Sequence, residues 1–433
     1  MMLTVTLLSD GTVDVPGLAL HHLDRATQTL VAREVMLAAH LQDRAAVPAF
    51  LERHSMEESW EYAVVEWMAA SPLYTQRLQR LMAYEGTGLS TIFKGLQLDV
   101  GFPHQFMDVG FRLHDEQDGE FWLRSCGALL DVLPMGDEMT QGMCHDIEDP
   151  TFDATAIATN PRARIRPLHR PPGVPKGGPH CHWTVRIRPE HPEVAQHPML
   201  EVVERSHLAA LPNDPPPSAE PGGWEDYAGP FDPHFELEDL SHRALALVGR
   251  EFAIQGHLLM RAGGLHNLDR FGPDEAARVA HQTMVGIGRV ESERLAEALG
   301  VGDDAAAIAN VARLHHLLSL DDYLGTDVEV VDSDRVRLRV GDSPSLDEGD
   351  PLSVGERLVA DDGTEIVASI VQGVNPRARV ERVGGGRTAT YDVTIDAEAP
   401  PAPDQPSVRV ARFSTGTTTV FVRRRPLRRV DVA

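Results

Sequence analysis

The stretch REVMLAAHLQDRAAVPAFLERHSMEESW, residues 33–60, decides the fold because the chain contains it twice. Residues 250–277 read REFAIQGHLLMRAGGLHNLDRFGPDEAA. Aligned without gaps, the two segments are identical at Arg33, Glu34, His40, Leu41, Arg44, Ala45, Leu51, Arg53 and Glu58 of the first. Self-similarity of this length at a fixed offset indicates an internal duplication.

Three later matches follow in the same order. NPRARI at 160–165 recurs as NPRARV at 375–380, and TVRI at 184–187 matches DVTI at 392–395. Between the first duplicated segment and NPRAR, Leu123-Arg124 falls on Leu338-Arg339. The chain is therefore expected to contain two homologous repeats, arranged as an internal pseudo-dimer.

Each repeat is expected to begin with helices and to continue with strands. Apolar residues recur at helical spacing over about 20–81 and again over 237–318. Two hairpins follow, with turns at Gln117-Asp118-Gly119 and at Asp332-Ser333-Asp334. The predicted class is α+β, with a helical layer on a mainly antiparallel sheet in each repeat.

These patterns divide the chain into five parts. They are an N-terminal hairpin at 1–17, the first repeat at 18–192, a Pro-rich linker at 193–235, the second repeat at 236–400 and a C-terminal hairpin and tail at 401–433.

Composition excludes several classes of partner. The net charge of -25 argues against nucleic acid and anionic membranes, and no stretch has the length of a membrane span. The N-terminus lacks the basic start of a signal peptide, and three cysteines are an odd number for a disulfide framework. We expect a cytoplasmic protein that acts on a small molecule.

The first repeat holds all three cysteines. The alignment places Cys126, Cys144 and Cys181 opposite Gly341, Val359 and Ala389. The neighbouring histidines are also replaced: His145, His180 and His182 face Ala360, Thr388 and Thr390. A repeat that keeps the scaffold without these residues indicates that they form a set with chemistry of its own.

Thiolates and imidazoles suit zinc, which is favoured here over iron or manganese. The predicted ligands are Cys126, Cys144, Cys181 and His182. The absence of a C-x2-C pair excludes a compact zinc finger. Two other interpretations stay open: a metal-free thiol site, and three core cysteines that act as small hydrophobic residues. Haem held by a single cysteine or histidine also stays open.

Strand alternation predicts where these side chains point. Cys181, Trp183 and Val185 share one face and are expected to point inward, whereas His180 and His182 share the other. Cys126 follows the outward phase of Trp122 and Arg124, unless Gly127 allows a kink.

The segment CHDIEDP, residues 144–150, adds acidic groups. His145 is a candidate fourth ligand or general base, and Asp146 a candidate acid or base. Glu148 and Asp149 are read as an acidic, solvated loop. His40 and His257 occur in both repeats and are read as structural.

The first repeat resembles L-2-amino-thiazoline-4-carboxylic acid hydrolase-like proteins and, more distantly, 4-vinyl-reductase-type small-molecule-binding domains. The likeness rests on LRSC ending at Cys126, MCHD with Cys144, NPRARI, and HCHW with Cys181. It implies a pocket between sheet and helices, and hydrolytic opening of a C–N ring helped by a divalent metal. A thinner likeness to alkylmercury lyases would use Cys126, Cys181 and Asp131.

The expected function is a metal-assisted hydrolase or lyase for a small organic molecule, with the site in the first repeat and with His145 and Asp146 as catalytic groups. The alternative is a non-catalytic, sensor-like protein that binds a small molecule or a metal and carries a structural zinc.

Overall fold

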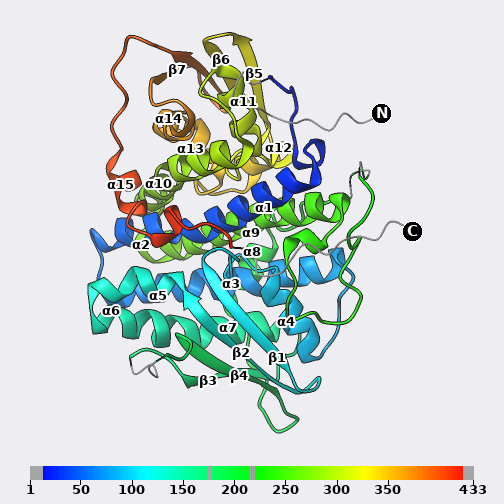
Figure 1. The fold of residues 1–433 in the computed structure, drawn as a ribbon. Coiled ribbons are helices and arrows are strands. Elements are labelled where there is room, and N and C mark those ends of the chain that lie inside the picture. The colour runs from blue at the N-terminus through cyan, green and yellow to red at the C-terminus, as the bar shows by residue number, and fades with distance from the viewer. Residues whose placement is uncertain (1–12, 173–176, 215, 217, 219, 423–433) are drawn as a thin grey trace.

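The computed structural model describes residues 13–172, 177–214, 216, 218 and 220–422. Two four-stranded antiparallel sheets lie at opposite ends of the molecule, with the long helices between them (Figure 1). The α+β class and the arrangement of helices on antiparallel sheets are confirmed.

The same order of elements occurs in both repeats. The main elements of the first are α1 (Arg25–Leu41), α2 (Asp43–Leu51), α3 (Met56–Leu81), α4 (Leu89–Gln97), β1 (Met107–Leu113), β2 (Asp118–Cys126), α5 (Gly127–Val132), α6 (Asp137–Gln141), a π-helix (Gly142–Ile147), α7 (Glu148–Ile157), β3 (Ala163–His169), β4 (Cys181–Ile187) and α8 (Pro198–Glu204).

Those of the second are α9 (His242–Phe271), α10 (Pro273–Leu299), α11 (Ala305–Leu314), α12 (Asp321–Leu324), β5 (Thr326–Asp332), β6 (Arg335–Val340), α13 (Val354–Val359), α14 (Gly363–Val374), β7 (Ala378–Gly384), β8 (Ala389–Ile395) and α15 (Pro406–Ala411). The sheets have equivalent strand orders, β1-β2-β4-β3 and β5-β6-β8-β7. Both predicted hairpins are present, as β1–β2 and β5–β6.

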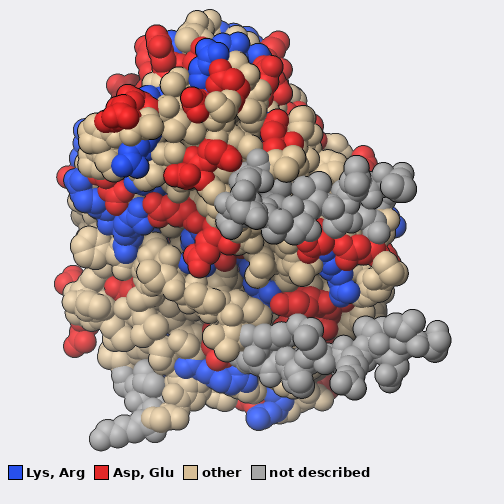
Figure 2. Space-filling view, turned by 45° about the horizontal axis from the view of Figure 1, so that its top comes forward, with Lys and Arg blue, Asp and Glu red and all other residues tan. Residues whose placement is uncertain are grey.

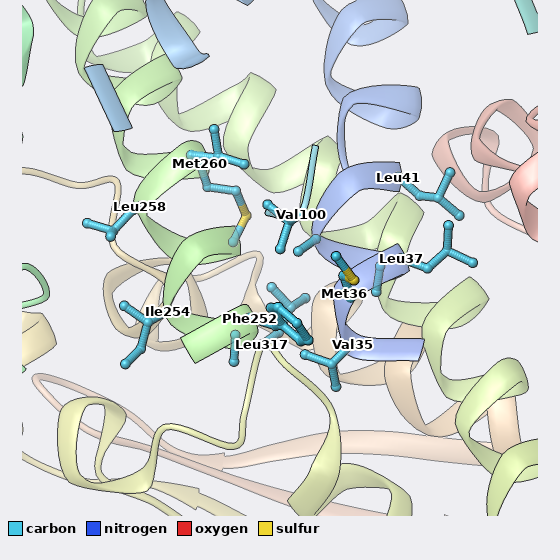
Figure 3. Packing of buried hydrophobic residues seen from close by; sticks show 14 of the residues in the cluster. Val35, Met36, Leu37, Leu41, Val100, Phe252, Ile254, Leu258, Met260 and Leu317 are labelled. Carbon is cyan, nitrogen blue, oxygen red and sulfur yellow. The ribbon is translucent and has the colours of Figure 1, made fainter. Parts of the chain in front are cut away.

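The first helix of each repeat packs on the other repeat. α1 lies against α9 and α10, whereas α9 lies against α3. Figure 3 shows side chains of α1 and α9 meeting around Val100 and Leu317, which follow α4 and α11. One hydrophobic cluster contains buried residues of both repeats. The two halves therefore share a core.

Ion pairs that cross between the repeats explain many of the duplicated positions. Glu34 of α1 binds Arg294 of α10, and its counterpart Glu251 of α9 binds Arg77 of α3. Both arginines also donate to backbone carbonyl groups of the segment that follows α15 or α8: Arg294 to Gly416, Thr417 and Thr419, and Arg77 to Ala209 and Leu211.

Two further identities follow the same rule. Arg53 binds Glu275 across the repeats, and the duplicated Arg270 lies near Glu58. Three of the nine identical positions, those of Glu34, Arg53 and Glu58, thus form ion pairs between the repeats in both copies.

Two segments differ from expectation. The linker at 193–235 contains α8, which packs against α3 and α9, and it also buries Tyr227 and Phe235. The C-terminal hairpin is wrong for its described part: 406–411 form α15, which begins at Pro406 and packs on α10. The N-terminal hairpin lies mostly outside the described residues.

Two buried carboxyl groups, Asp43 of α2 and Glu66 of α3, are hydrogen-bonded to each other. Burial raises the pKa of both groups, and the charge of Asp43 raises that of Glu66 further. The folded pair therefore holds protons that the unfolded chain, with ordinary carboxyl pKa values, has already released.

Because the folded state binds more protons above the ordinary carboxyl pKa, its stability falls as pH rises toward the raised pKa, by about 1.4 kcal/mol per pH unit and group. Glu66→Gln is expected to remove the contribution of Glu66 to this pH dependence of the free energy of unfolding. Urea unfolding between pH 5 and pH 9 measures it, with the exposed Glu57→Gln as control. Parallel profiles for Glu66→Gln and the wild type would contradict the assignment.

Candidate metal centre and the cysteine cluster

A buried acid–imidazole group lies in the second repeat. Glu291 is on α10, and His315 and His316 follow the last residue of α11. All three side chains are completely buried. Among the described residues, they form the one group of three His, Cys, Asp or Glu side chains whose ligand atoms lie within 4.8 Å of one another. This group could hold a metal ion.

Both imidazoles turn Nδ1 toward the same carboxylate oxygen. His315 Nδ1 lies 3.1 Å from Glu291 Oε2, and His316 Nδ1 is in hydrogen-bond contact with the same oxygen. The other oxygen, Oε1, accepts a hydrogen bond from the backbone N–H of His316 at 2.8 Å. Three donor atoms thus converge on one point.

The ring of His315 is held in the tautomer that a ligand needs. Its Nε2 donates to the Gly288 carbonyl at 3.0 Å, because a carbonyl can only accept. The Nδ1 lone pair faces Glu291 Oε2 and accepts a hydrogen bond from the Leu317 backbone N–H at 3.2 Å, which a metal ion would have to replace. A backbone carbonyl that accepts from the far ring nitrogen is the usual support of a metal-binding histidine.

Burial changes the acidity of all three groups. It raises the pKa of Glu291 to about 7, although the charge of His315 opposes this. It lowers the pKa of His315 to about 4 and that of His316 to about 3. The imidazoles are therefore neutral at pH 7, the form in which histidine binds metals.

Glu291, His315 and His316 were not predicted from the sequence, because the two repeats were compared only for residues that the first has and the second lacks. Continuing the gap-free alignment places Glu291 opposite Tyr74, whose hydroxyl donates to Asp99 at 2.9 Å near the end of α4. The available signal was the paired histidines in LHHLLSL, which fall on Leu98 and Asp99 of the first repeat in the same alignment.

All three cysteines of the first repeat are unpaired and buried. The expected orientation of Cys181 is confirmed, because Cys181, Trp183 and Val185 are buried in β4. The phase of Cys126 is resolved by a bulge: Ser125 pairs with Asp108 and Leu123 with Val109, so that Arg124 is extra. The bulge returns Cys126 to the interior.

Strand pairing corrects one match of the sequence alignment. Leu123 pairs with Cys181, and Val340 pairs with Ala389. Leu123 therefore corresponds to Val340 and Cys126 to Ser343, not to Leu338 and Gly341. The match had used the 215-residue offset between the two NPRAR segments, whereas Leu123 and Val340, like the aligned helices, are 217 residues apart. Cys126 and Ser343 both stand immediately before a helical turn.

The carboxyl group of Glu148 lies near enough to the three thiols to affect their pKa values. Burial, and then the charge of Glu148, raises the pKa of Cys126 to about 12 and raises those of Cys144 and Cys181 well above the usual value. Glu148 Oε2 is buried without a hydrogen-bond partner, and burial raises the pKa of this carboxyl group to about 8. Glu148 is therefore no solvated loop residue, in contrast to the expectation.

The other predicted site residues lie elsewhere. His182 Nε2 is 2.8 Å from Glu120 Oε2 on the outer face of the sheet. His145, on the π-helix, donates from Nε2 to the Pro171 carbonyl at 2.7 Å, and Asp146 is exposed. The structure brings Cys126, Cys144 and Cys181 into electrostatic reach of one another, but not these three groups.

Asp131 holds the C-terminal segment. Its carboxylate accepts from Arg44 Nε at 3.0 Å, from Ser414 Oγ at 2.6 Å, and from the backbone N–H and the hydroxyl of Thr415, both at 2.7 Å. With these partners, Asp131 acts as an anchor between the repeats.

The charge of the surface and the length and hydropathy of the helices indicate which partners to consider. Acidic and basic side chains are interspersed over the face shown in Figure 2. Among the helices that the structure describes, none is both long and apolar enough to cross a membrane.

No family model, no curated protein and no solved structure matches the chain. The resemblance described above stays a prediction.

Proposed function

We propose that this protein binds a divalent metal ion, with zinc favoured, through Glu291, His315 and His316. The observation that supports the proposal is the convergence of Glu291 Oε2 and two Nδ1 atoms in a fully buried position. Two histidines and one glutamate are a donor set known from catalytic zinc sites, in which the fourth position is open to water or substrate. Zinc bonds of about 2.0–2.1 Å keep tetrahedral donors roughly 3.4 Å apart, close to the 3.1 Å found for His315. His316 Nδ1 is hydrogen-bonded directly to the same oxygen, and this hydrogen bond would give way to the metal.

The role proposed for the metal is structural. Complete burial gives a substrate no access to the three donors, and the site joins α10 to the segment after α11. His257 of α9 donates to the His316 carbonyl at 2.9 Å, so the site also contacts the helix that packs on the first repeat. We place the protein in the cytoplasm, where its free thiols would stay reduced.

Metal analysis of the purified wild type is expected to find about one zinc ion per chain, because one group of three donors is available. Removal by a chelator is expected to lower the thermal midpoint. Zinc at a hundred times its dissociation constant stabilises the chain by about 2.7 kcal/mol. His315→Ala and Glu291→Gln are expected to lose the metal and this stabilisation.

Two variants serve as controls. Asp99→Asn changes the residue of the first repeat that aligns with His316, and Cys181→Ala removes one of the three thiols. Both variants are expected to keep the metal. If the purified wild-type protein contains no metal and binds no added zinc, the proposal is wrong. If Cys181→Ala loses the metal and His315→Ala keeps it, the cysteines bind the metal instead of Glu291, His315 and His316.

The second candidate function is the metal-assisted hydrolase or lyase expected from the resemblance. Glu148 favours it, because a carboxyl group with a pKa of about 8 is protonated at pH 7 and can serve as a general acid beside three thiols. Hydrolysis of 2-amino-thiazoline-4-carboxylate tests it. Glu148→Gln is expected to abolish turnover, and no turnover by the metal-loaded wild type would exclude this substrate.

A further inference from the structure

A cavity that is independent of the metal centre lies at the start of α4. Its volume is about 880 Å³, within the usual range of small-molecule sites. Three parts of the chain form most of its wall: the loop from α3 to α4, the turn between β1 and β2, and the linker after Tyr227. The wall also includes a buried cation, Lys94 of α4, which is 6% exposed.

Lys94 has hydrogen bonds but no counter-ion. Its Nζ donates to the carbonyl groups of Tyr227 at 2.8 Å and Gly229 at 2.6 Å, and no carboxylate of the described residues is ion-paired with it. An ammonium group has three hydrogens, so one is left for another partner. Burial lowers the pKa of Lys94, although the charges of Glu116 and Asp226 oppose this. The neutral amine therefore forms more readily than on an exposed lysine.

Carbonyl binding alone does not explain a lysine at this position. The chain has two lysines, Lys94 and Lys176, among 40 basic residues. In the second repeat an arginine holds the incoming segment, since Arg313 of α11 donates to the Val15 carbonyl at 2.9 Å. The gap-free alignment places the buried Val311 of α11 opposite Lys94, so the fold needs no cation there. Unlike arginine, a lysine can lose its proton and become a nucleophile.

The rest of the wall favours an uncharged ligand with hydroxyl groups. It contains two acids, two amides and three hydroxyl residues: Glu85, Glu116, Gln117, Asn160, Thr87, Ser90 and Thr91. Glu85, Thr87 and Gln117 are exposed, so a molecule in the cavity can reach them. The two carboxylates disfavour an anion, whereas carboxylates and amides accept hydrogen bonds from hydroxyl groups.

We propose that this cavity binds a small hydroxylated aldehyde or ketone and that Lys94 forms an imine with its carbonyl group. The ammonium first gives up a proton to solvent. Nζ then adds to the carbonyl carbon, and loss of the carbonyl oxygen as water leaves a C=N bond. The protonated imine keeps one N–H, which can donate to the carbonyl of Tyr227 or Gly229. The hydroxyl groups of the ligand face Glu85, Thr87 and Gln117.

Reductive trapping of the full chain with cyanoborohydride tests the proposal. The probe is glyceraldehyde, and propanal is its control because it has the same three carbons without hydroxyl groups. Hydride converts the C=N bond to a secondary amine, which peptide mass spectrometry locates. Labelling of Lys94 is expected to saturate with glyceraldehyde concentration. Relative to N-acetyl-lysine in the same sample, it is expected to be about tenfold faster than with propanal, the effect of one or two hydrogen bonds.

Two substitutions separate the site from the fold. Lys94→Arg keeps a cation for the two carbonyl groups and is expected to fold without forming the adduct. Ala228→Trp leaves Lys94 in place: Ala228 is exposed and lines the cavity, so the larger ring is tolerated while it occupies the ligand's space. It is expected to lower the labelling of Lys94 by glyceraldehyde to the level found with propanal, whereas Ala228→Ser leaves it unchanged.

Four results would each overturn the proposal. They are no adduct on Lys94 of the wild type, labelling that rises without saturation, equal relative labelling by glyceraldehyde and propanal, and undiminished labelling of Ala228→Trp.

Discussion

Glu251→Ala is expected to lower the free energy of unfolding by about 3–5 kcal/mol, the cost of breaking a buried ion pair from one side. Glu251 is 1% exposed. Its carboxylate accepts from Arg77 Nε at 3.0 Å, from Arg77 Nη2 at 2.7 Å and from Asn213 at 3.1 Å. The alanine variant leaves the Arg77 guanidinium buried and without a counter-ion.

Urea unfolding measures this loss. Arg77→Met combined with Glu251→Met is expected to recover much of it, because two apolar side chains of similar volume leave no charge unpaired. The exposed Glu57→Ala is the control, with an expected change within about 0.5 kcal/mol. A loss below about 1 kcal/mol for Glu251→Ala, or a double variant no more stable than the single one, contradicts this account of the pair.

Cutting the chain between Pro216 and Pro217 is expected to give two fragments that fold only together. α9 packs on α3, and α1 packs on α10, so the first fragment alone lacks the helix that covers α3 and the second alone lacks the helix that covers α10. Mixed or co-expressed, the fragments 1–216 and 217–433 are expected to form a one-to-one complex with a cooperative thermal transition, whereas neither fragment alone shows one.

Size-exclusion chromatography with calorimetry distinguishes the outcomes. A fragment that is monomeric and unfolds cooperatively by itself would show that the repeats are independent domains. Adding Glu251→Ala to the second fragment provides a matched control, since it removes one ion pair between the fragments and is expected to weaken their complex.

Much of the fold could be predicted because the duplication repeats the same order of helices and strands in two different sequences. Turn residues at 117–119 and 332–334 placed both hairpins, and Pro273 placed the start of α10, where proline is tolerated in the first turn. The prediction of a C-terminal hairpin was wrong. It relied on the β-branched residues of VRVA at 408–411, but this segment follows Pro406, which is the first residue of α15. Local propensity did not decide between the two.

Less of the candidate site could be predicted. Strand alternation correctly placed Cys181, since β4 is regular. Cys126 was ambiguous because alternation cannot show a bulge, which depends on the partner strand β1. Glu148 looked like a loop acid, although the fold buries its Oε2 near the thiols.

The amino-acid sequence by itself determined the two repeats, the order of their elements and the face of β4 that turns inward, because repetition and periodicity are properties of neighbouring residues. The tertiary structure decided how the repeats exchange their first helices and why Glu34, Glu251 and their arginines are duplicated. It also assembled Glu291 with His315 and His316. Such contacts join segments far apart along the chain, and the distance between them is set only when the helices pack.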